Sequence, residues 1–253
     1  MIERTVGIPT RAGVMETFIC HPEAGAPFAP VVVFMDVWGI REELLDIARR
    51  IAVVGYYVLL PDLYYRQGRV RHEFRDAHGR MISLKALSAA QQAQVVAPLE
   101  RTPDAFVVED SGAMLAFLDR GEPVRKGAIG SIGYCMGGRH VFRVAAAYPE
   151  RFRAGASLHG TDLVTDKPDS PHIDARKAKG ELYCGHGEFD HWSGAANIRA
   201  LEASLAASDV RLTQVEHKGA DHGYALPDRD IHHKAGANRD WEIIFAMFRR
   251  QLS

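Results

Sequence analysis

The chain has 253 residues, of which 47% are hydrophobic and 25% are charged, and its formal net charge is −1. This composition is typical of a folded globular protein, and the near-neutral charge gives no electrostatic reason to expect nucleic acid or an anionic membrane as a partner. No apolar run approaches the roughly 20 residues that span a bilayer, and the first residues lack the apolar stretch of a signal peptide. The three cysteines are too few for a disulfide framework, which favours a cytoplasmic protein with free thiols over one with a single disulfide. They are Cys20, Cys135 and Cys184.

Hydrophobic patterning predicts strands and helices in alternation along the chain. A β-hairpin comes first, with strands at 5–9 and 14–20 and a turn between them. Six further strands are predicted at 30–35, 56–60, 127–132, 152–158, 180–184 and 210–216. Helices are predicted at 41–54, 83–96, 103–119, from the turn at 135 to 148, 195–207 and 239–252. We expect the segment 66–80 to be a loop. The alternation favours one α/β domain over residues 1–253, with a mostly parallel sheet covered by helices on both faces.

The most informative motif is the hexapeptide 133–138, Gly-Tyr-Cys-Met-Gly-Gly, which lies between a predicted strand and a predicted helix. This Gly-x-nucleophile-x-Gly pattern is typical of a nucleophile elbow, where glycines allow a sharp turn and the nucleophile projects above the sheet. Cys135 would be the nucleophile, favoured as a thiolate by the helix N-terminus. The backbone N–H groups of Met136 and Val37 would form the oxyanion hole. The alternative is an ordinary glycine-rich turn with an inert buried cysteine.

Two downstream residues complete the expected set of catalytic groups. In hydrolases with this elbow the order along the chain is nucleophile, acid, histidine. Asp190 follows the strand at 180–184, and His222 lies in a glycine-flanked loop after the strand at 210–216. We therefore predict that Asp190 orients His222 and that His222 exchanges a proton with Cys135 and the leaving group. The neighbouring rivals for these roles are Glu188, His191 and Asp221.

Several other histidines follow Cys135, but none has the spacing of a zinc motif, so we expect neither a metal nor a cofactor. They include His186, His191, His217, His232 and His233.

These motifs together resemble the dienelactone hydrolase (carboxymethylenebutenolidase-like) family of the α/β-hydrolase superfamily. The resemblance covers nearly the whole chain and rests on the cysteine elbow and on four other segments. These are Phe-Met-Asp-Val-Trp-Gly at 34–39, Pro-Asp-Leu-Tyr at 61–64, Gly-Glu-Phe-Asp at 187–190 and His-Gly-Tyr at 222–224. The resemblance implies an α/β-hydrolase fold and a Cys-Asp-His triad, which falls on Cys135, Asp190 and His222.

The chain departs from the family pattern in two places. The family has a glutamate that pairs with the resting thiol, and the matching residue here is Asp36; a simple turn-capping role for this aspartate is the alternative. Dienelactone hydrolase itself has an arginine about one turn after the catalytic histidine that holds the substrate carboxylate. That position is Leu226 here, and the nearest arginine is Arg229. The segment 66–80 offers other arginines as an anion clamp or a lid: Arg66, Arg69, Arg71, Arg75 and Arg80.

We therefore expect hydrolysis of a small carboxylic ester or lactone through an acyl-thioester, by a monomer or homodimer whose partner is a small molecule. Aromatic side chains near these motifs would line an apolar pocket, although core packing explains each of them equally well. They are Trp38, Tyr64, Tyr134, Trp192 and Tyr224. The alternatives are a thioesterase or peptidase with the same triad, and a catalytically silent ligand-binding protein on a hydrolase fold. A redox role for Cys135 is disfavoured because the chain has no Cys-x-x-Cys motif.

Overall fold

Eight strands form one sheet in the computed structural model, which describes all residues 1–253. The order across the sheet is β1-β2-β4-β3-β5-β6-β7-β8. The first two strands form an antiparallel hairpin, β2 pairs with β4 in antiparallel fashion, and all other pairs are parallel. The mostly parallel sheet is thereby confirmed. The strands are β1 (Ile2–Thr10), β2 (Gly13–His21), β3 (Ala29–Phe34), β4 (Tyr56–Pro61), β5 (Ile129–Tyr134), β6 (Phe152–Leu158), β7 (Gly180–Gly187) and β8 (Val210–His217).

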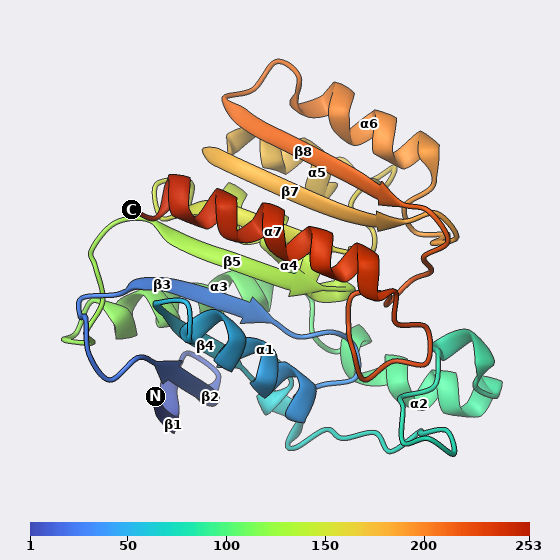
Figure 1. The fold of residues 1–253 in the computed structure, drawn as a ribbon, viewed down its shortest axis with the longest axis horizontal. Helices are drawn as coiled ribbons and strands as arrows, with labels where there is room; N and C mark the ends of the chain where they lie inside the picture. Colours follow the sequence, from blue (N-terminus) through green and yellow to red (C-terminus); the bar gives the residue numbers. More distant parts are fainter.

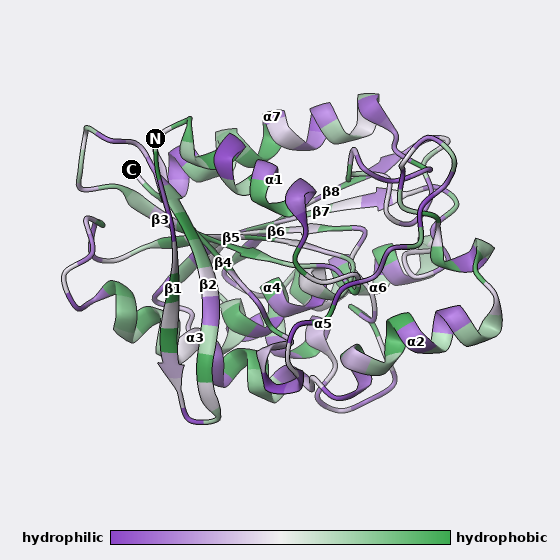
Figure 2. Ribbon diagram, turned by 90° about the horizontal axis from the view of Figure 1, so that it is seen from below, coloured by the Kyte–Doolittle hydropathy of each residue, from purple (hydrophilic) through white to green (hydrophobic).

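Helices cover both faces of this sheet, as the pattern predicts. Viewed along the sheet, α1 and α7 lie on one face, whereas α3, α4, α5 and α6 lie on the other (Figure 2). The central strands β3, β4 and β5 are buried over their whole length, which explains their continuous apolar sequences. The helices are α1 (Glu42–Ala52), α2 (Ala89–Glu100), α3 (Asp104–Leu118), α4 (Met136–Ala147), α5 (Pro171–Asp174), α6 (Ala195–Leu205) and α7 (Lys234–Gln251).

The carboxyl ends of the parallel strands meet at one edge of the sheet, where the loops predicted to carry chemistry emerge. The arrows of β3, β5, β7 and β8 all end at this edge, and α2 lies beyond it (Figure 1). Most of the apolar core is one cluster of 57 buried residues around the sheet. A separate cluster of five lies under the segment that contains α2 and joins that segment to the loop after β3. Its members are Val37, Trp38, Met81, Leu87 and Val95.

The short helix α5 was not expected from the sequence, and two expected helices begin elsewhere because their caps decide where they start. The stretch predicted as a helix at 83–96 instead contains a short 3-10 turn, Leu84–Ala86, followed by α2. Ser88 and Gln91 form a capping box, each side chain accepting a hydrogen bond from the other residue's backbone N–H, and this places the start of α2 at residue 89. Helix α7 begins five residues before the predicted start because the His233 ring accepts the backbone N–H of Gly236.

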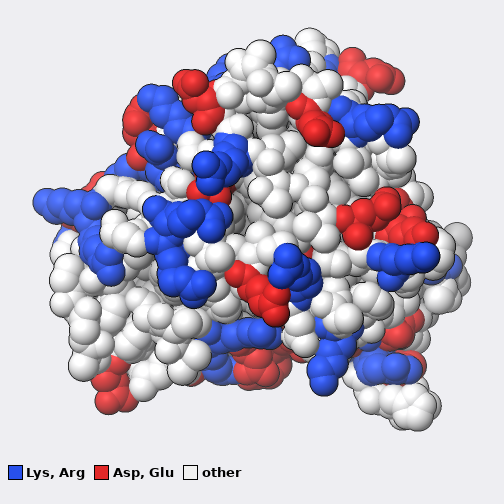
Figure 3. Space-filling model, turned by 45° about the horizontal axis from the view of Figure 1, so that its top comes forward, with Lys and Arg blue, Asp and Glu red and all other residues white.

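The surface carries both signs of charge. Basic and acidic side chains are interspersed among uncharged ones on the face shown in Figure 3, in keeping with the net charge of −1. None of the helices combines the length and the apolar character needed to cross a bilayer.

Candidate active site

Cys135 occupies a strained turn between β5 and α4. Its backbone dihedrals are φ 55° and ψ −118°, in a region that residues with a Cβ seldom adopt. It directly precedes Met136, the first residue of α4, whose N–H has no acceptor within the helix. The N–H of Val37, in the loop after β3, likewise donates to no backbone acceptor. The thiol therefore sits at a helix N-terminus, with two free N–H groups on the elements expected to supply them.

The glycines around this turn are required by close packing of the backbone. A Cβ on Gly133 would lie 2.0 Å from the carbonyl oxygen of Gly137, and a Cβ on Gly137 would lie 2.4 Å from that of Phe34. Any side chain at these two positions would push α4 away from β3 and β5. The elbow is thus possible only with glycine on both sides of Cys135.

Asp190 and His222 meet at the same edge of the sheet from the loops after β7 and β8. His222 Nδ1 donates to Asp190 Oδ2 over 2.9 Å, and Asp190 Oδ1 accepts the backbone N–H of Trp192 over 2.9 Å. Burial works against a charged His222, but the negative charge of Cys135 and the hydrogen bond to Asp190 outweigh it and raise the pKa of His222 to about 10. The bond to Asp190 places the proton on Nδ1 and leaves Nε2 available to the thiol.

Cys135 and His222 both line a cavity of about 380 Å³ between the sheet edge and α2. Its apolar walls are Val37, Trp38, Leu84, Val96, Leu99 and Trp192. The rival carboxylates do not bond to the His222 ring: Asp221 pairs with Lys85 and accepts the backbone N–H of His222, and Glu188 accepts the N–H of Gly219. A buried acid, a histidine and a thiol therefore converge on one small, largely apolar pocket.

Comparison with known proteins identifies the family. The model of the dienelactone hydrolase family matches residues 15–252. The chain belongs to the dienelactone hydrolase family. It is 28% identical to a protein of Methylorubrum extorquens named "Putative carboxymethylenebutenolidase", over 99% of this chain and 81% of that protein. A Synechocystis protein of the same name is 25% identical over 98% of this chain and 96% of its own. A crystal structure titled as a putative dienelactone hydrolase from Klebsiella pneumoniae superposes with a TM-score of 0.83 at 23% identity, covering 98% of both chains. Family membership makes this protein a carboxylic ester hydrolase with an α/β-hydrolase fold.

One arginine of this hydrolase faces the cavity without a partner. The Arg229 side chain is buried, lies 5.2 Å from the centre of the Trp38 ring, and forms no hydrogen bond or ion pair. Burial lowers the pKa of this guanidinium from its ordinary value. A cation held in this way favours an anionic ligand, because such a ligand would restore the interactions that burial removes. None of the arginines in the segment 66–80 lines the cavity.

The aromatic side chains singled out from the sequence divide into two groups. Trp38 and Trp192 line the cavity, whereas Tyr64, Tyr134 and Tyr224 are fully buried away from it. The Tyr64 hydroxyl donates to the carbonyl of Val37 over 3.2 Å, and the Tyr224 hydroxyl donates to Asp240 over 2.7 Å. None of the three tyrosines lines the cavity, so the core-packing explanation applies to them.

Asp36 is also engaged away from the thiol. Its two carboxylate oxygens accept from Arg41 at 2.7 and 3.0 Å, and one also accepts the N–H of Trp38 at 3.1 Å. Arg41 in turn holds Asp228 at 2.6 Å, across 187 residues of sequence. No hydrogen bond joins Asp36 to Cys135. Through Arg41, the two aspartates connect the loop after β3 to the loop that carries Arg229, a role closer to the turn-capping alternative.

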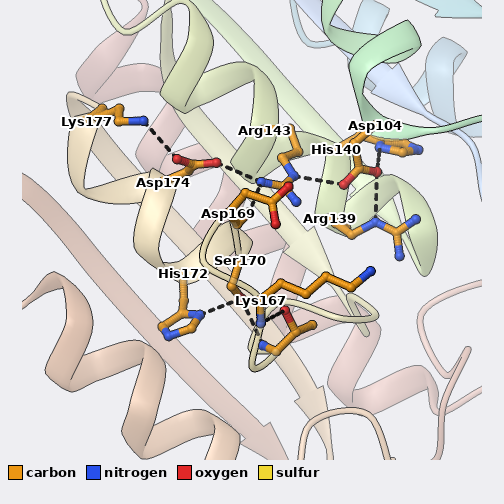
Figure 4. A network of polar contacts seen from close by, with 11 residues as sticks. Asp104, Arg139, His140, Arg143, Lys167, Asp169, Ser170, His172, Asp174 and Lys177 are labelled. Carbon is orange, nitrogen blue, oxygen red and sulfur yellow. Dashed lines mark hydrogen bonds and ion pairs between the residues drawn. The ribbon is translucent and has the colours of Figure 1, made fainter.

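A second, larger cavity of about 1000 Å³ lies beside α3 and α4 and touches the first at Leu99 and Asp162. Several of its charged groups form ion pairs with one another (Figure 4). Asp104 accepts from Arg139 at 2.9 Å and from Arg143 at 2.8 Å, and Arg143 also pairs with Asp174 at 2.8 Å. Neither Cys135 nor His222 faces this cavity.

The remaining cysteines have no part in the site. Cys20, Cys135 and Cys184 are all free thiols, and Cys20 and Cys184 are buried. Burial raises the pKa of Cys20 to about 12 and raises that of Cys184 still further. The structure contains no group of three or more His, Cys, Asp or Glu side chains arranged to hold a metal ion. Cys135 is the one thiol open to a ligand.

Proposed function

We propose that this hydrolase cleaves small carboxylic esters or lactones with Cys135 as the nucleophile, Asp190 and His222 as its partners, and an acyl-thioester intermediate. The observation that carries the proposal is the hydrogen bond of 2.9 Å between His222 and the buried Asp190, with the His222 ring in the same cavity as Cys135. This arrangement matches a nucleophile, a base within reach of it and an acid that orients the base.

In the first half of the reaction the Cys135 sulfur attacks the carbonyl carbon, and the carbonyl oxygen becomes an oxyanion. The N–H groups of Met136 and Val37 stabilise this charge. As the tetrahedral intermediate collapses, the carbon–oxygen bond to the leaving group breaks and His222 Nε2 donates its proton to the departing oxygen. A thioester on Cys135 and neutral His222 remain.

In the second half His222 accepts a proton from a water molecule, whose oxygen attacks the thioester carbonyl. The carbon–sulfur bond then breaks, releasing the carboxylic acid and restoring the Cys135 thiolate beside protonated His222. Asp190 keeps the proton of His222 on Nδ1 throughout, so that Nε2 always faces the reacting atoms.

We further propose that the preferred substrates carry a carboxylate. The unpaired Arg229 guanidinium in the cavity wall would receive it, and the Trp38 ring beside that arginine would cover the apolar part of the substrate. The volume of about 380 Å³ limits the substrate to a small molecule.

The test of the nucleophile is hydrolysis of p-nitrophenyl acetate by wild type, Cys135→Ala and Cys184→Ala, with intact mass spectrometry of the quenched reaction. We expect an acetyl adduct on wild type and on Cys184→Ala, and neither adduct nor turnover above background with Cys135→Ala. Turnover by folded Cys135→Ala at the wild-type rate would refute the proposal.

The carboxylate preference is tested by comparing p-nitrophenyl acetate with the mono-p-nitrophenyl ester of succinic acid, for wild type and Arg229→Met. We expect kcat/KM for the succinate ester to fall by about 10- to 100-fold in the variant, while the acetate changes little. Equal losses on both esters would contradict a carboxylate-binding role for Arg229.

A further inference from the structure

A second histidine lies directly behind the predicted nucleophile. His159 follows β6, is completely buried, and was not among the residues suggested by the sequence. Its Nδ1 accepts the backbone N–H of Cys135 over 3.1 Å. The centre of its ring is 5.1 Å from that of His222, and the two rings meet edge to face at 72°. It therefore contacts the backbone of the nucleophile and the ring of the base at once.

The loop after β6 holds the elbow from both sides of Cys135. The Cys135 N–H is shared between His159 Nδ1 and the carbonyl of Leu158, each at 3.1 Å, and the Cys135 carbonyl accepts the N–H of Thr161 at 3.2 Å. His159 has a positive φ of 40° itself, and its own N–H is anchored on the carbonyl of Gly185 at 2.8 Å. A backbone with the dihedrals of Cys135 persists only where its surroundings hold it, and His159 supplies the one side chain among these contacts.

This hydrogen bond also determines the protonation state of the ring. Because Nδ1 accepts the Cys135 N–H, the ring proton must lie on Nε2, which is buried without a partner. The groups around His159 are His222, Arg229 and the rings of Tyr134 and Tyr224. Burial, followed by the charges of His222 and Arg229, lowers the pKa of His159 well below its ordinary value. Because the His159 ring is neutral, it does not repel the positive charge of the His222 imidazolium in this buried site.

We propose that His159 is a positioning residue for the reaction: it holds the Cys135 backbone in the strained elbow and forms an uncharged wall beside His222. This inference rests on the proposed function, because it takes Cys135 as the nucleophile. His159 touches no reacting atom, and its effect acts through the placement of the sulfur relative to His222 and the oxyanion N–H groups.

The test removes the hydrogen-bond acceptor Nδ1 of His159 while a side chain of similar size still fills its place. His159→Phe keeps a planar ring but removes Nδ1, whereas His159→Asn keeps a hydrogen-bond acceptor close to the same place. Two rates are measured for each: kcat and KM with p-nitrophenyl acetate, and alkylation of Cys135 by iodoacetamide followed by mass spectrometry. The control is His186→Phe, because His186 is equally buried but pairs with Gln214 and not with Cys135.

We expect His159→Phe to lower kcat and slow alkylation by about 10- to 100-fold with KM changed less than about threefold, and His159→Asn to recover most of both rates. We expect His186→Phe to stay within about threefold of wild type. If His159→Phe does not fold, His159→Leu replaces it, with the same expected loss. Wild-type rates in the folded Phe or Leu variant would overturn the proposal, as would an Asn variant that is impaired as strongly.

The alkylation rate separates this inference from the proposed function. If wild type hydrolyses no ester, or if Cys135→Ala hydrolyses as fast as wild type, the proposed function fails. Slower alkylation of Cys135 in His159→Phe than in His159→Asn would still support the positioning role, and equal alkylation rates would refute it.

Discussion

Replacing Asp190 with asparagine tests the electrostatic core of the proposed mechanism. The substitution keeps the size of a buried side chain that accepts hydrogen bonds from His222 Nδ1 and from the N–H of Trp192. It removes the negative charge, and if the new amide nitrogen faces the ring, His222 must carry its proton on Nε2. The ring could then no longer accept a proton at the position that faces the thiol.

The structure indicates the size of this effect. The pKa of His222 is raised from 6.5 to about 10, a net stabilisation of the imidazolium by roughly 5 kcal/mol. Burial opposes this rise, and the charge of Cys135 and the interactions with Asp190 provide it. If Asp190 supplies about half of this stabilisation, losing it raises the activation free energy by roughly 2–3 kcal/mol, which lowers the rate about 100-fold. The wrong tautomer of His222 can lower the rate by as much again. We expect kcat to fall by about 10²- to 10⁴-fold.

The assay is steady-state hydrolysis of p-nitrophenyl acetate between pH 5 and pH 10, with melting curves to show that each variant is folded. The matched control is Glu188→Gln, which neutralises the other acidic residue of the same loop; its carboxylate accepts the N–H of Gly219 and does not contact His222. We expect the control to stay within about threefold of wild type. A folded Asp190→Asn enzyme with a kcat within about threefold of wild type would show that the reasoning is wrong.

Three further predictions follow from burial and packing. In the native protein iodoacetamide should modify Cys135 alone, with the two buried cysteines reacting only after denaturation; peptide mass spectrometry checks this, and early labelling of a buried thiol would contradict it. Burial, together with the charge of Asp228, raises the pKa of Glu43 to about 7. The stability that Glu43 contributes is therefore fully present below its unfolded-state pKa near 4.5 and is lost as the pH rises through 7. In urea denaturation at pH 8, Glu43→Gln should therefore have a free energy of unfolding about 1–2 kcal/mol above that of wild type, after allowance for the partial exposure of this residue. At pH 4 the two proteins should be equally stable. Equal stability at pH 8 would contradict the burial argument. Gly137→Ala should destabilise the fold by about 2–4 kcal/mol in the same assay, whereas Gly194→Ala, whose Cβ would meet nothing within 4 Å, should change it little.

The elements and the elbow could be predicted from the sequence because their causes are local. The apolar run of β3 and the spacing of α1 reflect which faces those segments bury, and both elements lie where the patterns place them. The turn at Cys135 depends on glycines within two or three residues of it, so a short motif suffices to predict it. The order of Cys135, Asp190 and His222 along the chain could also be read directly, because each follows a parallel strand and such strands end at one edge of the sheet.

The surroundings of the site were decided by tertiary structure alone. Asp36 faces Arg41 rather than the thiol because Arg41 is held in place by Asp228, and no pattern in the sequence relates residues so far apart. The three tyrosines are buried away from the cavity, and long-range contacts such as the bond from Tyr224 to Asp240 of α7 hold them there, which hydrophobicity along the chain does not reveal. His159 contacts Cys135 only because β5 and β6 are neighbours in the sheet. Local patterns thus determine which elements form and where the turn at Cys135 lies, whereas long-range contacts determine which side chains surround that cysteine.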